Sequence, residues 1–374
     1  MMNQTGEGAF GTNYAGAYLL LRAVLDARLP WLIAEQMYPN WGGPDGDELD
    51  DGDELDEEVE EESASVAPLL LALGLRWRGV PVDYSTTLDS GLAWMAGLDK
   101  APGWGTLYSQ WQQTTATEHV DFQKELVRVL FGQRMLPSDT LHLHRVELGE
   151  EQVALIAGST DSDLWPLGQV IQTDSELTPI LQEWAAWWEE RTDAKPTWIM
   201  DAELQQRCGT LPPELEVQVV SASVAVNEEE DDDDDGEESG ADDGATDEEQ
   251  EDESGDFTKA HAQNRAALLD TMETLEEGRL GLPQLDLTVA LVTVSLLRLW
   301  ARWLRQFASS STPYLLANFI RRDGTVQVDD AQIQVRLDPM PLDVVLELVD
   351  YFDPIERISW LDKRTVRYAI REQW

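Results

Sequence analysis

Apolar residues recur every three or four positions in much of the chain, the spacing of a helix that buries one face. Between these stretches lie turn residues and acid-rich runs. The longest apolar run, at 285–304, predicts the most deeply buried helix. The helices that this pattern predicts cover residues 13–27, 66–77, 118–132, 176–191, 259–278, 284–307, 313–321 and 341–351.

Shorter stretches alternate apolar and polar residues, as half-buried strands do. Residues 140–148 and 152–157 predict one β-hairpin, and residues 325–328 and 331–337 predict a second one around Asp329 and Asp330. Residues 365–370 predict a final strand that joins the second hairpin. The expected fold class is therefore α+β and mostly helical. It has an N-terminal helical region with a hairpin near 140–157, and a compact C-terminal unit of helix, hairpin, helix and strand.

Two acid-rich runs divide this pattern. Residues 45–62 carry 13 acidic and no basic side chains, and residues 228–256 carry 19 acidic and none basic. Together they supply −32 of the formal net charge of −47. Such runs cannot bury enough apolar surface to offset the entropy of ordering. We therefore expect a disordered acidic loop at 45–62 and a disordered polyacidic linker at 227–257, which separates an N-terminal region, 1–226, from a C-terminal unit, 258–374.

Charge and cysteine content exclude several classes of protein. A strongly negative chain is a poor ligand for nucleic acid or anionic membranes, whose affinity comes from Lys and Arg. The single cysteine, Cys208, cannot form an internal disulfide, which fits a reducing compartment. Residues 1–10 have no basic residue or apolar core, so we expect no secretory signal. The 285–304 run contains Asp286, Arg298 and Arg302, which favours a buried helix over a membrane span. The expected location is cytoplasmic, either free or within an assembled particle.

Two patterns suggest metal binding. The tandem hexamer at 45–56 places acidic residues and Gly52 as in a calcium loop that begins at Asp47, but Leu49 stands where an oxygen ligand is needed. We expect a solvated insert there; weak, non-specific divalent binding stays open. His142 and His144 share one face of a predicted strand, but no third ligand has supporting spacing. We expect exposed strand histidines and no specific metal.

No catalytic motif stands out. The chain lacks G-x-S-x-G, a P-loop, G-x-G-x-x-G after a strand, H-E-x-x-H and C-x-x-C. Paired carboxylates carry no weight among 73 acidic residues. We expect no enzyme and no cofactor.

Aromatic residues are the more informative side chains. Trp184, Trp187 and Trp188 recur along one side of a predicted helix, which is typical of a core or a docking face. Further aromatics lie in the C-terminal unit. The candidate protein-docking residues are Trp184, Trp187, Trp188, Trp300, Trp303, Tyr314, Phe319 and Trp360.

The C-terminal features follow a recognisable order. A hydrophobic helix with Trp300 and Trp303 leads to a Leu- and Phe-containing segment, 314–324, that ends in Arg-Asp-Gly. A hairpin, a Leu-rich segment at 342–346 and the segment 355–361 follow. This succession resembles the C-terminal region of tape-measure-like proteins of contractile injection systems, the phage-tail-like particles. The resemblance covers 285–374, and weaker likeness occurs at 13–30 and 66–97.

The resemblance implies a non-enzymatic structural or assembly component of such a particle, a length ruler or an accessory near the tube or baseplate. Its partners would be tube, sheath or baseplate proteins, held by hydrophobic docking faces. The helices are short for a ruler, because a helix gains only about 1.5 Å per residue. The alternative is an acidic scaffold or chaperone outside these systems, which captures a basic partner with residues 228–256.

Overall fold

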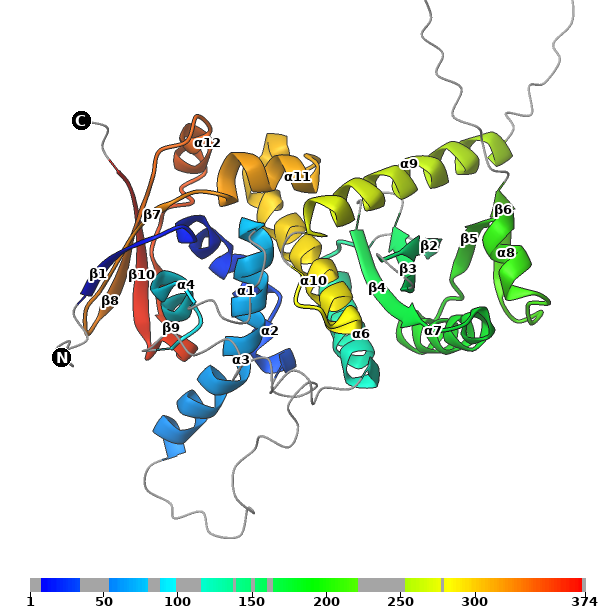
Figure 1. Ribbon diagram of the computed structural model, residues 1–374, viewed down its shortest axis with the longest axis horizontal. Coiled ribbons are helices and arrows are strands. Elements are labelled where there is room, and N and C mark those ends of the chain that lie inside the picture. The colour runs from blue at the N-terminus through cyan, green and yellow to red at the C-terminus, as the bar shows by residue number, and fades with distance from the viewer. Residues whose placement is uncertain are drawn as a thin grey trace, which may run out of the picture.

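Two five-stranded sheets flank a central group of helices in the computed structural model of the chain (Figure 1). The structure describes residues 8–33, 54–79, 88–98, 116–136, 139–148, 152–159, 164–220, 253–276 and 279–371. Within these residues the chain is of the α+β class and mostly helical, which confirms the expected class.

The first sheet joins the two ends of the described chain. Its strand order is β1-β7-β8-β10-β9, where β7 (Gly324–Val328) and β8 (Gln332–Leu337) form the expected hairpin. The last strand, β10 (Arg364–Ile370), joins it in parallel to β8 and pairs on its other side with β9 (Ile355–Ile358). The other edge is β1 (Gly8–Thr12), antiparallel to β7. Residues from the start of the sequence thus complete a sheet that we expected to form from residues 258–374 alone.

The second sheet has the order β4-β3-β2-β5-β6. The hairpin expected near 140–157 is confirmed as β2 (Thr140–Glu147) and β3 (Val153–Ser159), which β4 (Leu164–Ile171) extends. A short 3-10 turn, η3 (Asp174–Glu176), and helix α7 (Leu177–Thr192) lead to β5 (Thr197–Asp201), parallel to β2. Helix α8 (Ala202–Cys208) then leads to β6 (Glu216–Val220), parallel to β5.

The central helices carry most of the apolar surface. Helix α10 (Pro283–Ala301) is buried from Leu285 to Ala301 and packs against α3, α6 and β4. Over its most apolar 18-residue window 89% of the residues are buried, as in the core helix of a folded domain. The neighbouring helices are α3 (Glu54–Arg78), α4 (Ser90–Met95), α6 (Ala116–Gly132) and α9 (Glu253–Thr274).

The first expected helix, 13–27, is broken into three pieces. They are the 3-10 helix η1 (Ala15–Leu20), α1 (Leu21–Asp26) and α2 (Leu29–Leu32). Gly16 lies so close to the carbonyl of Ile320 that a Cβ would stand 1.9 Å from its oxygen. This close approach requires glycine, and a local tightening of the helix accompanies it.

The helix expected at 284–307 is also shorter than the pattern implied. After Ala301 the chain tightens into η5 (Arg302–Phe307), where Arg305 has φ +43°. Helix α11 (Thr312–Leu315) then passes into a π-turn, η6 (Leu316–Ile320). Helix α12 (Asp343–Leu348) and the 3-10 turn η7 (Ser359–Leu361) complete the C-terminal region.

The structure corrects part of the expected disorder. Residues 54–62 of the acidic loop begin helix α3, and residues 253–257 of the linker begin α9. Glutamate has good helix propensity, and negative charge is favourable near a helix N-terminus. The rest of the loop, the calcium-like start at Asp47 and the remainder of the linker lie outside the described residues.

Two buried ion pairs tie these elements together. Arg76 of α3 reaches Asp286 of α10 at 2.5 Å, and Asp286 also accepts backbone hydrogen bonds from residues 280–282. Arg322 pairs at 2.5 Å with Asp343, the first residue of α12. Because an unpaired buried charge is costly, each partner strongly constrains where the other lies.

Candidate functional site

The eight candidate docking residues divide into a buried and an accessible group. Trp184, Trp188, Trp300, Phe319 and Trp360 are all at most 1% exposed. They belong to the core, which corrects the expectation that they form docking faces. Trp187 is partly buried, whereas Trp303 and Tyr314 are 42% and 39% exposed.

The buried group is held by aromatic contacts on several elements. On α7, Trp184 lies 6.5 Å from Trp198 of β5, and Trp188 meets Phe131 of α6 edge-on at 4.9 Å. Trp184 and Trp188 therefore face β5 and α6. Near the first sheet, Trp360 donates a hydrogen bond to the carbonyl of Met95 at 3.2 Å.

Trp303 lies in an open groove at the end of the central helix. We call this the Trp303 groove; its volume is about 480 Å³, and its lining residues are Asp26, Gln133, Leu299, Arg302, Trp303, Arg305, Leu348, Val349 and Asp350. Leu348 is 78% exposed, the most exposed large apolar side chain among the described residues. An indole and a leucine thus line one groove that carries charges at its rim.

The indole of Trp303 is held in place from below. It meets Tyr351 edge-on at 6.3 Å, and the guanidinium of Arg22 lies 5.7 Å from its ring. The carboxylate of Asp26 accepts a side-chain hydrogen bond from Trp303. A fixed aromatic side chain loses little conformational entropy on binding a partner. Trp303 is therefore an exposed aromatic whose orientation is already set.

The backbone of the same groove is strained. Arg305 combines φ +43° with ψ −81°, a conformation that non-glycine residues rarely adopt. Such strain costs of order 1–3 kcal/mol and clusters at functional sites. Arg305 lines the same groove as Leu348, the most exposed large apolar side chain of the described residues.

The spacing of apolar residues in α12 also indicates that Leu348 is exposed. The buried face of its helix contains Asp343 and Leu346, while Val344 and Leu348 follow each other at the i, i+4 spacing. These two apolar residues lie off the buried face and are 55% and 78% exposed. Apolar residues on the wrong face of an amphipathic helix indicate a surface patch.

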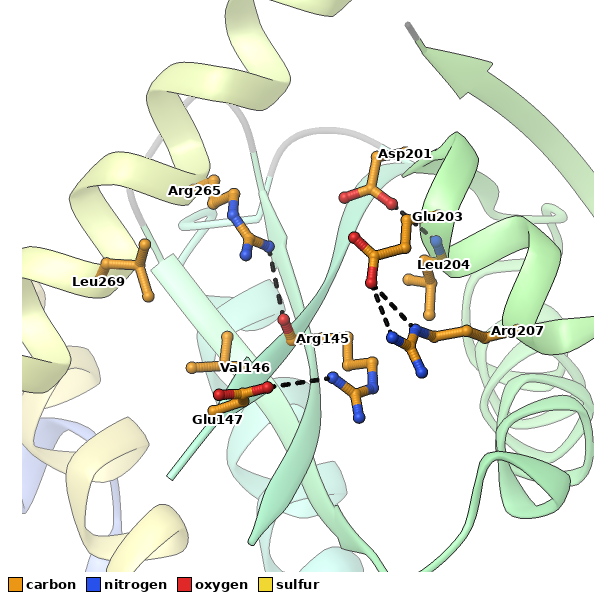
Figure 2. A pocket seen from close by; sticks show the side chains of 9 residues that line it. All are labelled: Arg145, Val146, Glu147, Asp201, Glu203, Leu204, Arg207, Arg265 and Leu269. Carbon is orange, nitrogen blue, oxygen red and sulfur yellow. Dashed lines mark hydrogen bonds and ion pairs between the residues drawn. The ribbon is translucent and has the colours of Figure 1, made fainter. Parts of the chain in front are cut away.

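A second pocket lies beside α9, at the carboxyl ends of β2 and β5 (Figure 2). It has a volume of about 290 Å³, and its lining residues are Arg145, Val146, Glu147, Asp201, Glu203, Leu204, Arg207, Arg265 and Leu269. Arg207 is bound by Glu203 at 2.8 Å and by Asp174 at 3.1 Å. Arg145 lies 3.6 Å from Asp174, and Arg265 donates to the Arg145 carbonyl at 3.4 Å. Acidic partners thus offset the guanidinium charges, so the pocket has no net preference for an anion.

Three histidines gather in the protein interior next to this pocket. His142 and His144 of β2 are fully buried, which corrects the expectation of exposed strand histidines, because α9 covers this face of the sheet. His261 of α9 joins them, with its Nδ1 3.0 Å from Nδ1 of His142. The oxygen of Asn264 accepts hydrogen bonds from His144 Nε2 at 2.8 Å and Trp165 Nε1 at 3.0 Å.

These histidines are neutral at physiological pH. Burial, together with the smaller effect of the nearby His261, lowers the pKa of His142 to about 4. The pKa values of His144 and His261 are also lowered, again chiefly by burial. Over the part of the chain that the structure describes, no group of three or more His, Cys, Asp or Glu side chains has the arrangement of a metal site.

Cys208 does not have the properties of a catalytic nucleophile. Burial, together with the smaller effect of the negative charge of Asp174, raises the pKa of its thiol to about 11. The thiol is therefore protonated at neutral pH, whereas reactive cysteines have lowered pKa values.

No family model, no curated protein and no solved structure matches the chain.

Proposed function

We propose that the protein is a non-enzymatic assembly component that binds another protein through the Trp303 groove. The observation that carries this proposal is the 42% exposure of a tryptophan that neighbouring side chains hold in place. Tryptophan is enriched among the few residues that supply most of the binding energy at protein interfaces. Leu348, at 78% exposure, provides a second apolar contact in the same groove.

The composition of the groove suits a protein partner better than a small molecule. The groove is open and combines an aromatic and aliphatic floor with Arg302, Arg305, Asp26 and Asp350. Interfaces between proteins typically have an apolar centre and a polar rim. Small-molecule sites bury most of their ligand in a closed, mainly apolar cavity.

The identity of the partner rests on the sequence resemblance. Tape-measure-like proteins of contractile injection systems would place the chain with tube, sheath or baseplate proteins. Trp303 belongs to the segment that carries this resemblance. In this proposal the acid-rich runs keep the chain soluble and repel unwanted partners, because a large net charge opposes association.

The test uses the tagged full-length chain expressed in its native cells and identifies co-purified proteins by mass spectrometry. We expect the wild-type chain to recover tube, sheath or baseplate proteins. We expect the Trp303→Ala variant to lose them. Trp31→Ala is the matched control, because Trp31 is 41% exposed and does not line the groove. Retention of the particle proteins by the Trp303 variant would contradict the proposed groove, and their absence from the wild-type sample would contradict the system.

The acidic scaffold is the second candidate, and the run of 19 acidic residues at 228–256 favours it. A basic partner held by that run would dissociate as salt is raised, since exposed charges are screened within about 10 Å at 0.1 M ionic strength. A partner held by Trp303 and Leu348 would remain. Elution with sodium chloride therefore separates the two functions.

A further inference from the structure

The first sheet presents one face to the central helices, and no helix of the described residues covers its other face (Figure 1). Val326, Val335 and Val366 point to the helices and are fully buried. Successive residues of a strand point to opposite faces, so the residues between these valines form the outer face. That face carries a hollow of about 610 Å³, bordered by Ala9, Gly11, Gln327, Gln334, Arg336 and Ala369.

Three arginines surround the small side chain of Ala369. Arg336 of β8 is its direct neighbour across the parallel pair. Arg371, two residues after Ala369, also lines the hollow. Arg367, two residues before Ala369, lies outside that lining but on the same face of β10. On the β1 side the hollow is lined by the small residues Ala9 and Gly11. The space there is open, because a Cβ at Gly11 would meet nothing within 4 Å. We call this feature the arginine hollow.

The arginines of the hollow are only partly neutralised. Arg371 lies 3.3 Å from Asp338 in an exposed pair, and Arg336 donates to the neutral amide of Gln334 at 3.2 Å. Among the residues that the structure describes, no acidic side chain pairs with Arg336 or Arg367. No carboxylate of the described residues 8–33 and 279–371 lines the hollow. This lack of partners is unusual in a chain with 73 acidic and 26 basic residues.

Like charges on neighbouring strands destabilise a sheet. Arg336 and Arg367 face the same side of two paired strands, one residue pair apart in register on that face. The second pocket, beside α9, differs from the arginine hollow, because Arg207 there is neutralised by two carboxylate partners. An external anion would relieve the repulsion in the hollow and accept charge-assisted hydrogen bonds.

We propose that the arginine hollow binds an acidic, extended segment of a partner protein, whose carboxylates pair with Arg336, Arg367 and Arg371. Side chains two residues apart on an extended segment repeat at about 7 Å, which matches the spacing of same-face residues along β10. The amides of Gln327 and Gln334 supply donors and acceptors for the segment's backbone. A long nucleic acid is the poorer ligand, because its phosphates would also meet the negative charge of the rest of the chain.

This site is independent of the Trp303 groove. The two share no lining residue, so failure of one proposal leaves the other unaffected.

The test measures fluorescence anisotropy of a labelled peptide of about ten alternating Glu and Ser residues on the purified full-length chain. We expect saturable binding that weakens with salt, and none of the matching peptide with Gln in place of Glu. Replacing Arg336, Arg367 and Arg371 together by Ala should raise Kd by about tenfold or more, since each loses a hydrogen bond to a charged group.

Two further variants separate a built site from general charge attraction. Arg128, Arg191 and Lys195 are exposed elsewhere, so their joint replacement by Ala removes the same charge and should leave Kd unchanged within about twofold. Ala369→Leu keeps every charge but fills the hollow, and should also weaken binding. Circular dichroism and thermal melts confirm that each variant is folded.

Several results would overturn the proposal. They are absence of peptide binding, an equal loss of affinity in the control triple variant, and unchanged affinity in Ala369→Leu. Tighter binding of a labelled oligothymidylate than of the peptide would assign the hollow to nucleic acid instead. A dimer in sedimentation that the arginine replacements dissolve would assign it to a second copy of the chain.

Discussion

Trp188 and Trp303 are both tryptophans of helical segments, yet they have opposite environments. Trp188 lies on α7 between the second sheet and α6 and is fully buried, whereas Trp303 follows the end of α10 and is 42% exposed. Helical spacing marks both as members of an apolar face. What separates them is whether another element covers that face, and the covering elements come from distant parts of the chain. The local sequence pattern therefore identifies an apolar side chain of a helix face, but not whether that side chain lies in the core or at a binding surface.

The largest effect should come from the buried tryptophan. Trp188→Ala should lower the free energy of unfolding by about 3–5 kcal/mol, because it removes a large buried ring and leaves a cavity. Urea denaturation followed by circular dichroism measures the change. A loss below about 1 kcal/mol would mean that Trp188 behaves like a surface residue.

The same contrast between inside and outside holds for charges on α3. Asp286→Asn should cost about 3–5 kcal/mol of stability, since it leaves Arg76 buried without its carboxylate. Asp323→Asn is the matched control, because it breaks the exposed pair with Arg78, two residues away, and should cost less than about 1 kcal/mol. Equal losses in urea denaturation would remove the distinction.

Acid should destabilise the protein through its buried histidines. All four histidines of the chain have lowered pKa values, about 4 for His119 and His142, against about 6.5 when unfolded. The unfolded state binds more protons in this range, so stability is full above pH 6.5 and falls as the pH drops toward 4. The slope approaches about 1.4 kcal/mol per pH unit for His119 and for His142.

Denaturation in urea between pH 7 and pH 5 tests this, because few carboxylates titrate there. His119→Gln should make the slope shallower by one histidine's share. A stability that is constant or rises over this interval would contradict the lowered pKa values.

The smallest effect on stability belongs to the exposed tryptophan. Trp303→Ala should lower the free energy of unfolding by less than about 1 kcal/mol while removing the bound partner. Thermal melts and the co-purification experiment measure the two effects separately. A destabilisation comparable to that of Trp188→Ala would return Trp303 to the core.

Local pattern predicted the class of fold and much of its secondary structure. Both hairpins and the final strand are confirmed, since alternation is a direct record of the two faces of a strand. The pattern did not predict that β1 joins the C-terminal sheet, because Gly8–Thr12 has little apolar content and its pairing is long-range. Nor could it indicate that His261 would meet His142, as α9 and β2 are brought together only by the tertiary fold.

The eight candidate docking residues differ in how deeply the structure buries them. Trp303 and Tyr314 are accessible and Trp187 is partly buried. The other five candidates lie in the core, because aromatic side chains are common in cores as well as at interfaces. Helical spacing predicts that Val344 and Leu348 share a face. That this face is exposed follows only from the structure, which shows the buried face of α12.

The pairing of β1 with β7 has a kinetic consequence. Gly8 and Val328 are more than 300 residues apart, so β1 leaves the ribosome long before its partner exists. At about 5–20 residues per second, synthesis of the intervening chain takes roughly 15–60 s. During that interval β1 lacks its partner strand, and the first sheet can close only after β7 to β10 have been made.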